Sequence, residues 1–198
     1  MKRFLFSSAL GVLLAGLLAG CEGPRSTPKF ALTDVTGASF GGQLSLTDHH
    51  GQARTLADFR GKVVAVFFGF THCPDACPTT LAELAQVVKA LGPGGEKVQV
   101  LFVTVDPERD TPEVLRRYVT AFHPSFLGLY GDAQATARAA KEFKVFYQKQ
   151  PLKEGGYSVD HTAATYILDR EGRLRLFASH GTGAQALLHD IRLLLGGA

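Results

Sequence analysis

Two apolar segments with a helical repeat between them constrain the fold of this chain more than any other feature. Residues 63–68 form an uninterrupted apolar run, and residues 98–105 form a second run rich in valine. Strands that are buried on both faces have this composition, as in the parallel part of a sheet. Between the two runs, leucine and valine recur at helical spacing over residues 81–91. The sequence therefore predicts a strand–helix–strand unit with parallel strands.

The remaining pattern extends this unit to a thioredoxin-like order of elements. We expect a hairpin within residues 44–56, a helix that starts at Asp110–Glu113, a strand at 127–130, a helix from Asp132 to about Phe143, a hairpin within 165–178 and a helix at 184–195. The 198 residues fit a single folded domain without internal repeats. We therefore expect an α/β protein with a thioredoxin-like fold, in which helices flank a central mixed sheet.

The first twenty residues have the layout of a secretory signal. Lys2 and Arg3 precede an uncharged, mostly apolar stretch over residues 4–20. The sequence Leu18-Ala19-Gly20-Cys21 resembles the bacterial lipobox, in which the cysteine is lipidated and becomes the new N-terminus. An uncleaved membrane helix is the alternative, although the stretch is at the lower limit of the ~17–25 residues that a spanning helix needs. Both interpretations place the rest of the chain outside the cytoplasm. We expect a lipid anchor in the cytoplasmic membrane, facing the periplasm or the cell exterior.

The chain is expected to divide into three parts: a lipoprotein signal peptide (1–20), a lipid anchor and tether (21–40), and a thioredoxin-like domain (41–198). Residues 22–29 contain glycine and proline but no large apolar side chain, which is typical of a flexible link. The formal net charge is only +3. A basic surface for nucleic acid is therefore not expected.

Cys73 and Cys77 lie between the first predicted strand and the helix that follows it. Ligand sites form where strands end in open α/β sheets, and a helix N-terminus stabilises a thiolate. The Cys-x₃-Cys spacing is one residue longer than the usual redox pair, yet the sulfurs still converge if Cys77 begins the helix. The pair can close a disulfide or share a metal ion, because thiolates serve both purposes. Inert structural cysteines are the alternative, but Pro74, Asp75 and Pro78 make this a poor core segment.

Seven histidines are candidate metal ligands, and their positions separate them. His49 and His50 lie in a predicted turn and are expected to be exposed to solvent. His72 would point away from its neighbour Cys73 in an extended segment. His161 directly precedes a predicted strand, in a loop that faces the cysteine pair in a thioredoxin-like fold. Thioredoxins usually carry a proline at that place, so spacing alone leaves the role of His161 open.

An acidic segment, residues 105–112, follows the second predicted strand and leaves the sheet on the same side as the cysteine pair. A charged loop with a helix cap explains Asp110 to Glu113, because a capping residue, a proline and an acid open many helices. It does not explain Asp106, which stands at the end of the strand. We therefore expect Asp106 to orient a residue of the site.

Three segments of the chain together carry a resemblance to a known family. They are Phe68-Gly69-Phe70-Thr71-His72-Cys73-Pro74-Asp75-Ala76-Cys77-Pro78, the stretch from Val105 to Pro112, and Asp160-His161-Thr162. They resemble the Sco/SenC family of thioredoxin-like, membrane-tethered copper proteins, which are implicated in the assembly of cytochrome c oxidase. The similarity extends over about residues 41–195. It implies that Cys73, Cys77 and His161 hold copper as Cu(I), Cu(II) or both, with Asp106 and Asp160 beside the site.

The resemblance implies a membrane-anchored copper chaperone whose acceptor is the binuclear CuA centre in subunit II of cytochrome c oxidase. Another periplasmic copper chaperone is a further expected partner. Three ligands would leave one open coordination position, through which copper passes to the acceptor. The alternative is an extracytoplasmic thiol–disulfide oxidoreductase that reduces the CuA cysteines through Cys73 and Cys77. A thiol peroxidase fits less well, because the Thr-x₂-Cys arrangement of those enzymes is missing.

Overall fold

The structure is a computed structural model that describes residues 29–196 of the chain. The expected signal peptide, the lipobox motif with Cys21 and the first part of the tether lie outside these residues. Within the described range, the helices are all too short or too polar to cross a membrane.

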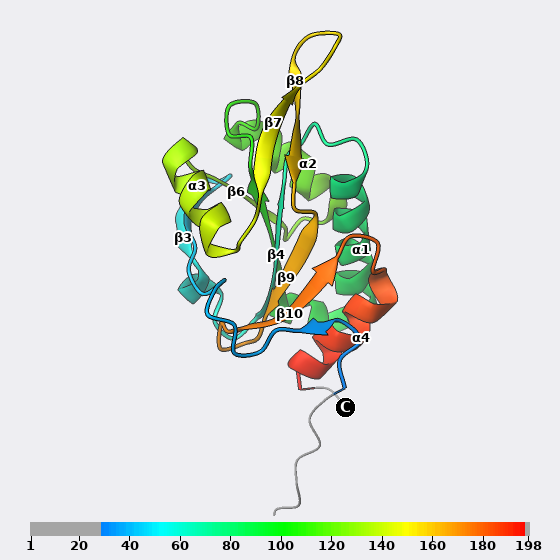
Figure 1. The fold of residues 1–198 in the computed structure, drawn as a ribbon. Coiled ribbons are helices and arrows are strands. Elements are labelled where there is room, and N and C mark those ends of the chain that lie inside the picture. The colour runs from blue at the N-terminus through cyan, green and yellow to red at the C-terminus, as the bar shows by residue number, and fades with distance from the viewer. Residues whose placement is uncertain (1–28, 197–198) are drawn as a thin grey trace, which may run out of the picture.

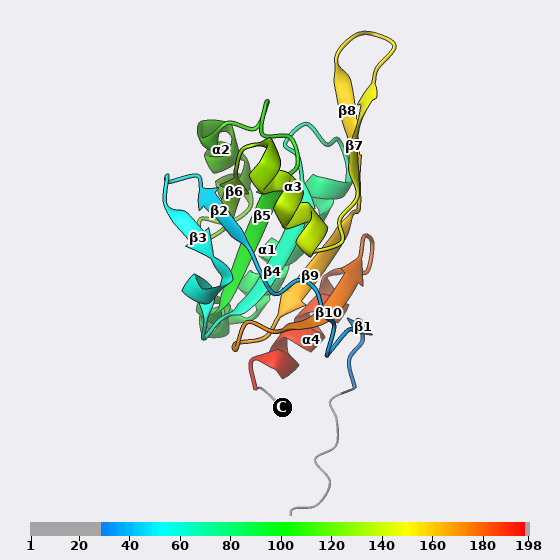
Figure 2. The same cartoon turned by 60° about the vertical axis from the view of Figure 1, so that its left-hand side comes forward.

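One eight-stranded mixed sheet forms the centre of the molecule (Figures 1 and 2). The described residues form these strands, of which all but β7 and β8 belong to the sheet: β1 (Thr33–Asp34), β2 (Ser45–Asp48), β3 (Ala53–Thr55), β4 (Val63–Gly69), β5 (Val98–Thr104), β6 (Leu127–Tyr130), β7 (Tyr147–Pro151), β8 (Tyr157–His161), β9 (Ala164–Leu168) and β10 (Leu174–Ser179). The sheet has the order β1-β10-β9-β4-β5-β6-β2-β3, and β7 pairs with β8 in a separate two-stranded ribbon. β5 lies parallel to β4 and β6, whereas the other neighbours are antiparallel. The predicted mixed sheet is therefore confirmed.

Four α-helices cover the two faces of this sheet in the part of the chain that the structure describes. They are α1 (Ala76–Ala90), α2 (Pro112–Phe122), α3 (Ala133–Glu142) and α4 (Ala184–Leu194), and short 3₁₀ helices span Leu56–Phe59 and Gly92–Lys97. Residues of α1, α2 and α4 pack on one face, and residues of α3 pack on the other (Figure 1). The side chains of Thr111 and Asp132 cap α2 and α3 by accepting a backbone N–H of the first turn. The helices predicted from apolar spacing are confirmed, with small shifts of their bounds.

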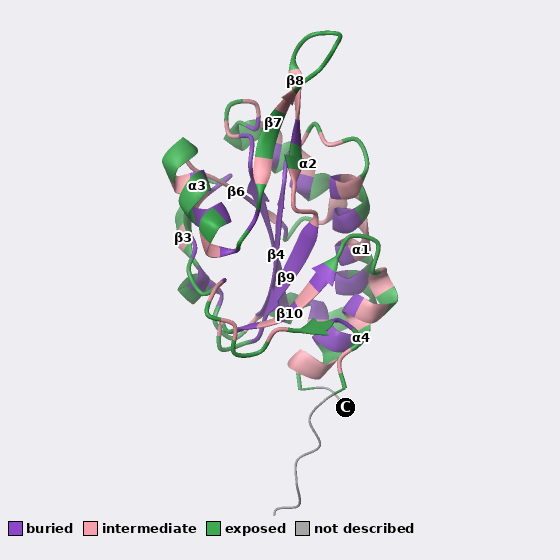
Figure 3. Cartoon of the chain, viewed as in Figure 1, coloured by how far each residue is buried: buried purple, intermediate pink, exposed green. Residues whose placement is uncertain are grey.

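Strand β4 lies between two hydrophobic cores. Successive side chains of a strand point to opposite faces, and both faces of β4 are covered, so all its residues are buried (Figure 3). Leu81, Leu84 and Ile191 belong to the core on the side of α1 and α4. Phe143 and Tyr166 belong to the core on the other side. Because both ends of β4 are fixed by this packing, its C-terminal end is a rigid base for the segment that carries the cysteines.

Residues 30–40, which the sequence analysis places in the tether, pack against the folded domain. Leu32 is buried in the core, and β1 pairs with β10. The buried carboxylate of Asp190 in α4 accepts hydrogen bonds from the backbone N–H groups of Ala31 and Leu32, at 2.9 and 2.8 Å. Part of the expected tether is thus a component of the domain, which begins before residue 41.

The ribbon of β7 and β8 replaces the loop that the sequence predicts before β9. Its strands read Tyr-Gln-Lys-Gln-Pro and Tyr-Ser-Val-Asp-His. In β8, Tyr157 and Val159 alternate with Ser158 and Asp160 over a short stretch, whereas β7 has no apolar alternation and is mostly exposed. Figure 2 shows the ribbon extending beyond the main sheet. The prediction of a loop at His161 is therefore wrong, since His161 is the last residue of β8.

We expect Asp190→Ala to lower the free energy of unfolding by about 2 kcal/mol, because a buried donor that loses its partner costs ~1–3 kcal/mol. Urea denaturation of the two proteins measures this change. Glu96→Ala is the control, since Glu96 is exposed and such substitutions usually change stability by less than ~0.5 kcal/mol. Equal stability of the Asp190→Ala variant and the wild type would show that the N-terminal segment is held by its side-chain packing alone.

Candidate metal centre

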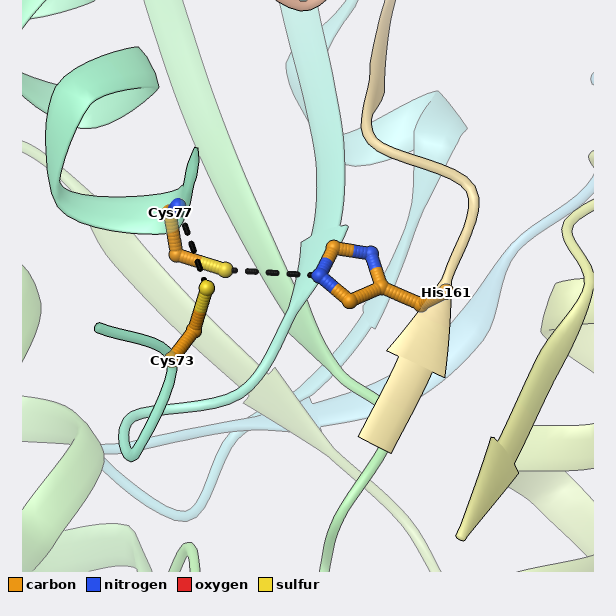
Figure 4. A group of neighbouring side chains, drawn as sticks. All are labelled: Cys73, Cys77 and His161. Atoms are coloured by element: carbon orange, nitrogen blue, oxygen red, sulfur yellow. Dashed lines mark hydrogen bonds between the residues drawn. The ribbon is translucent and has the colours of Figure 1, made fainter. Parts of the chain in front are cut away.

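Cys73, Cys77 and His161 form one compact group at the C-terminal end of β4 (Figure 4). Each side chain offers one ligand atom, and the three atoms all lie within 4.8 Å of one another. The Cys77 Sγ is 3.6 Å from the His161 Nε2. Both cysteines are free thiols in this structure. The structure thus brings together the three residues that the sequence analysis selects.

The last residue of β4, Gly69, has to be glycine for Cys77 to take this position. A Cβ atom added to Gly69 would lie 2.7 Å from the Cys77 Sγ and 2.9 Å from the ring of Phe102. Atoms cannot approach that closely, so any side chain at residue 69 would displace the buried sulfur. Cys77 is the second residue of α1 and has no exposed surface.

The sulfur of Cys73 lies at the N-terminus of α1. The backbone N–H of Cys77 donates to the Cys73 Sγ, at 3.4 Å, whereas the Asp75 side chain makes no capping hydrogen bond. The sulfur therefore accepts one of the N–H groups that a helix leaves unpaired at its start. This position stabilises negative charge on Cys73, because the N-terminal end of a helix carries partial positive charge.

The two cysteines differ in acidity. Hydrogen bonds from the Cys77 thiol and from the backbone N–H groups of Cys77 and Asp75 lower the pKa of Cys73 to about 4, although partial burial opposes this shift. The same shared hydrogen bond, together with burial, raises the pKa of Cys77 above its usual range. At neutral pH, Cys73 is therefore a half-buried thiolate, and Cys77 is the thiol that donates to it.

The ring of His161 is oriented by its neighbours. Its Nδ1 is 3.2 Å from the carbonyl oxygen of Thr162, and this bond assigns the ring proton to Nδ1. The Nε2 lone pair is then directed toward the cysteine pair, as in metal-binding histidines whose other nitrogen donates to a carbonyl. The rings of Phe67 and Phe70 contact the imidazole edge-to-face, with centroids 6.2 and 5.8 Å away. These contacts restrict the rotation of the ring.

Two acidic residues are expected beside the site, Asp106 and Asp160. Asp160 is exposed, and Asp106 is buried and bonded to Arg109 and Tyr157. Asp110 is also buried. It precedes Thr111, the residue that caps α2 within the predicted helix start.

The carboxylate of Asp110 accepts hydrogen bonds from the backbone and hydroxyl of Thr71 and from the hydroxyl of Thr104. It thereby ties the start of the cysteine segment to the end of β5. Burial raises the pKa of Asp110. Its position in the sequence could have indicated this role. Asp110 follows the end of β5 by six residues, and its partner Thr71 precedes Cys73 by two residues.

The structure corrects one prediction about the other histidines. His49 is buried, and its Nδ1 accepts the backbone N–H of Gly128 at 3.0 Å, which links the β2–β3 turn to β6. His50 is exposed, as predicted. His72 is exposed and lies 3.9 Å from the Asp110 carboxylate, and it is not part of the group formed by Cys73, Cys77 and His161.

Fold and site together define a class of protein: a thioredoxin-like domain in which a histidine completes a Cys-x₃-Cys pair. Comparison with protein families makes this specific, since residues 33–196 match the family model described as SCO1/SenC. The chain belongs to the SCO1/SenC family.

Individual relatives agree with this assignment. The chain is 44% identical over 196 residues to the human mitochondrial protein SCO2 homolog. The matched region covers 96% of this chain and 74% of the human protein. Copper-bound ScoI from Bradyrhizobium japonicum matches with a TM-score of 0.73 and 39% identity, over 79% of this chain and 100% of that one. Apo Sco1 from Thermus thermophilus matches with a TM-score of 0.76 and 45% identity, over 86% of this chain and 99% of that one.

The acidity of Cys73 is directly testable in the reduced, metal-free protein. With a pKa of about 4, Cys73 remains a thiolate down to mildly acidic pH, so iodoacetamide at roughly pH 6 should modify Cys73 and spare Cys77. Peptide mass spectrometry identifies the modified residue. In Cys77→Ala, the pKa of Cys73 should rise toward its ordinary value, because the largest cause of its depression is removed. Modification of Cys77 before Cys73 in the wild type would contradict this assignment.

Proposed function

We propose that this protein is a copper chaperone in which Cys73, Cys77 and His161 hold the copper ion. The observation that carries the proposal is the convergence of two sulfurs and one imidazole nitrogen within 4.8 Å. Thiolates favour Cu(I), and the added imidazole also suits Cu(II). Copper is the cargo of such a protein, so the site must bind the ion and also release it.

The burial of the ligands suits this role. Cys77 is fully buried, whereas Cys73 and His161 are partly exposed. Three protein ligands leave a position on the exposed side at which an acceptor's ligand can enter. Metal binding needs deprotonated sulfur, and the thiolate of Cys73 meets this need before copper arrives. Cys77 loses its proton when the ion binds.

The acceptor we propose is the CuA site of cytochrome c oxidase subunit II, and a second periplasmic copper chaperone is the proposed donor. The support is membership of a family whose members are implicated in the assembly of this oxidase. We also propose that Cys21 is lipidated and anchors the protein at the outer side of the cytoplasmic membrane. The support for the anchor is the motif Leu18-Ala19-Gly20-Cys21 after an apolar stretch.

A thiol–disulfide oxidoreductase is the second candidate function. The observation that favours it is the unequal acidity of the two cysteines, because an acidic, partly exposed thiolate beside a buried thiol is suited to attack a disulfide. Cys73 would attack a disulfide of the partner, and Cys77 would then displace the reduced partner and leave a Cys73–Cys77 disulfide. Such exchange does not need His161, whereas a copper site does.

The variant His161→Ala therefore separates the two functions. We expect its Cu(II) affinity to fall by more than ~100-fold. Loss of a residue that only hydrogen-bonds a metal ligand already lowers metal affinity by ~10–100-fold, and His161 is proposed as a ligand itself. Cu(I) affinity should fall less, because two thiolates alone can hold Cu(I). The fold and the rate of disulfide exchange should be retained. Anaerobic competition titrations with each copper ion, and a disulfide-reduction assay, measure these properties.

His50→Ala is the matched control, because His50 is an exposed histidine outside the site. It should bind both copper ions as the wild type does. If His161→Ala retains both affinities while disulfide exchange slows, the oxidoreductase function replaces the proposal.

Delivery itself is tested by mixing the copper-loaded protein with metal-free subunit II whose cysteines are already reduced. We expect the visible absorption of the CuA centre to appear with the wild type and not with the variant Cys73→Ser/Cys77→Ser. The same absorption obtained from free copper at an equal rate would show that the acceptor needs no chaperone. In that case, the protein would favour CuA formation only when the cysteines of subunit II are oxidised, and this result would support the reductase function.

A further inference from the structure

The position of His161 depends on a ribbon that is not part of the main sheet. β7 and β8 pair only with each other, and His161 is the last residue of β8. Figure 2 shows the loop end of the ribbon extending beyond the helices and strands of the domain. An isolated two-stranded ribbon is only marginally stable in water. Contacts with the rest of the domain must therefore hold β8 where His161 can meet the cysteines.

Arg109 and Asp106, which follow β5, make such contacts with the first residue of β8. The Nη1 of Arg109 donates to the carbonyl oxygen of Tyr157 at 2.8 Å, and its guanidinium carbon lies 3.8 Å from the centroid of the Tyr157 ring. The Nε of Arg109 donates to the carboxylate of Asp106. The Tyr157 hydroxyl donates to the other oxygen of the same carboxylate, at 2.8 Å. The three residues thus form a closed ring of contacts.

The contacts among Asp106, Arg109 and Tyr157 are well shielded from solvent and directional. The Asp106 side chain has no exposed surface, and that of Arg109 is only 26% exposed. Hydrogen bonds between a carboxylate and a guanidinium are stronger than neutral ones, and the planar fork of arginine fixes their direction. A lysine has the same charge but cannot bond the carboxylate and the carbonyl in one plane while stacking on a ring.

The same arginine is connected to the imidazole of His161 through Phe70. The guanidinium carbon of Arg109 is 5.9 Å from the centroid of the Phe70 ring, and that ring meets His161 edge-to-face. The carbonyl oxygen of Phe70 also accepts the backbone N–H of Cys73, at 3.2 Å. Phe70 therefore touches the arginine, the histidine and the cysteine segment.

Other contacts also link the ribbon to the domain, among them the packing of Tyr147 against the core. The Lys149–Glu108 ion pair joins exposed side chains, and such pairs contribute little. Val159 is buried in the core and anchors the middle of β8. Apolar packing is non-directional, so Val159 keeps the strand near the core without fixing its rotation or its slide along its own axis.

We propose that Asp106, Arg109 and Tyr157 are positioning residues that hold β8 in the register at which the His161 Nε2 faces Cys77. This rests on the proposed function, in which His161 binds copper. The three residues touch neither the cysteines nor the imidazole, so they act on the site through β8 and Phe70.

The test uses Arg109→Lys and Tyr157→Phe in the complete protein, with Arg54→Lys as a matched control. Arg54 also bonds a fully buried carboxylate, that of Asp48, at 2.8 Å, and its side chain is 27% exposed. It lies on the β2–β3 hairpin, so its loss should disturb a similar ion pair away from the ribbon. Tyr157→Phe keeps the stacked ring and removes only the hydroxyl bond to Asp106.

Two readouts use the reduced, metal-free protein and do not depend on copper. In Arg109→Lys, we expect amide hydrogen exchange in β7 and β8 to accelerate by roughly tenfold or more, as for the loss of ~1.4 kcal/mol of local stability. The nuclear Overhauser contacts of the His161 ring with Phe67 and Phe70 should weaken. Tyr157→Phe should change both in the same direction by a smaller factor. Arg54→Lys should change neither.

The third readout is the nitrogen hyperfine coupling in the electron paramagnetic resonance spectrum of the Cu(II)-loaded protein. It should weaken in Arg109→Lys, and Cu(II) affinity should fall by roughly tenfold while Cu(I) affinity is nearly retained. His161→Ala provides the reference without the coupling. Nitrogen coupling that persists in His161→Ala would refute the proposed copper site, whereas the two metal-free readouts would still decide the role of the positioning residues.

The positioning role is overturned if Arg109→Lys leaves ribbon exchange and the ring contacts of His161 as in the wild type. It is also overturned if exchange accelerates while those ring contacts stay unchanged, because the three residues would then stabilise the ribbon without placing the histidine. If Arg109→Lys does not fold, the smaller change in Tyr157→Phe decides by the same two criteria.

Discussion

The parallel pairing of β4 with β5 determines where the chemical groups of this protein lie. The pairing runs from Val63 opposite Val98 to Gly69 opposite Thr104, and the backbone continues it when Val105 donates to the Gly69 carbonyl. Because parallel strands end at the same edge of a sheet, the cysteine segment and the acidic segment leave β4 and β5 side by side. Asp110 then bonds Thr71 across this gap.

The site that results is asymmetric, and this asymmetry underlies both candidate functions. Cys73 accepts the hydrogen bonds that favour a thiolate, whereas Cys77 is buried against Gly69 and keeps its proton. A redox pair and a soft-metal site both need such sulfurs. His161 is the group that distinguishes them, and it arrives from a separate ribbon. The chemistry of the cysteines is therefore set by the rigid sheet, and the third ligand is set by the attachment of the ribbon.

Local sequence patterns were sufficient for much of the fold and for part of the site. The apolar runs of β4 and β5 and the helical repeat of α1 identify the unit that carries the cysteines, because burial on both faces leaves a clear signature in composition. Cys73 and Cys77 follow from their position between strand and helix. His161 could be selected only through the resemblance to a family, since the short alternation of Tyr157 and Val159 in its segment does not show which residues meet the cysteines.

The sequence by itself determined the strand–helix–strand unit and the cysteine pair within it, because spacing along the chain encodes local structure. Only the tertiary structure showed the ribbon of β7 and β8, the buried His49, the network of Asp110, and the packing of residues 30–40 on the domain. The environment of His49, the network of Asp110 and the packing of residues 30–40 depend on contacts between residues far apart in the chain, which leave no periodicity in the sequence. The ribbon is a local hairpin, but its mostly exposed strands carry only a weak apolar pattern.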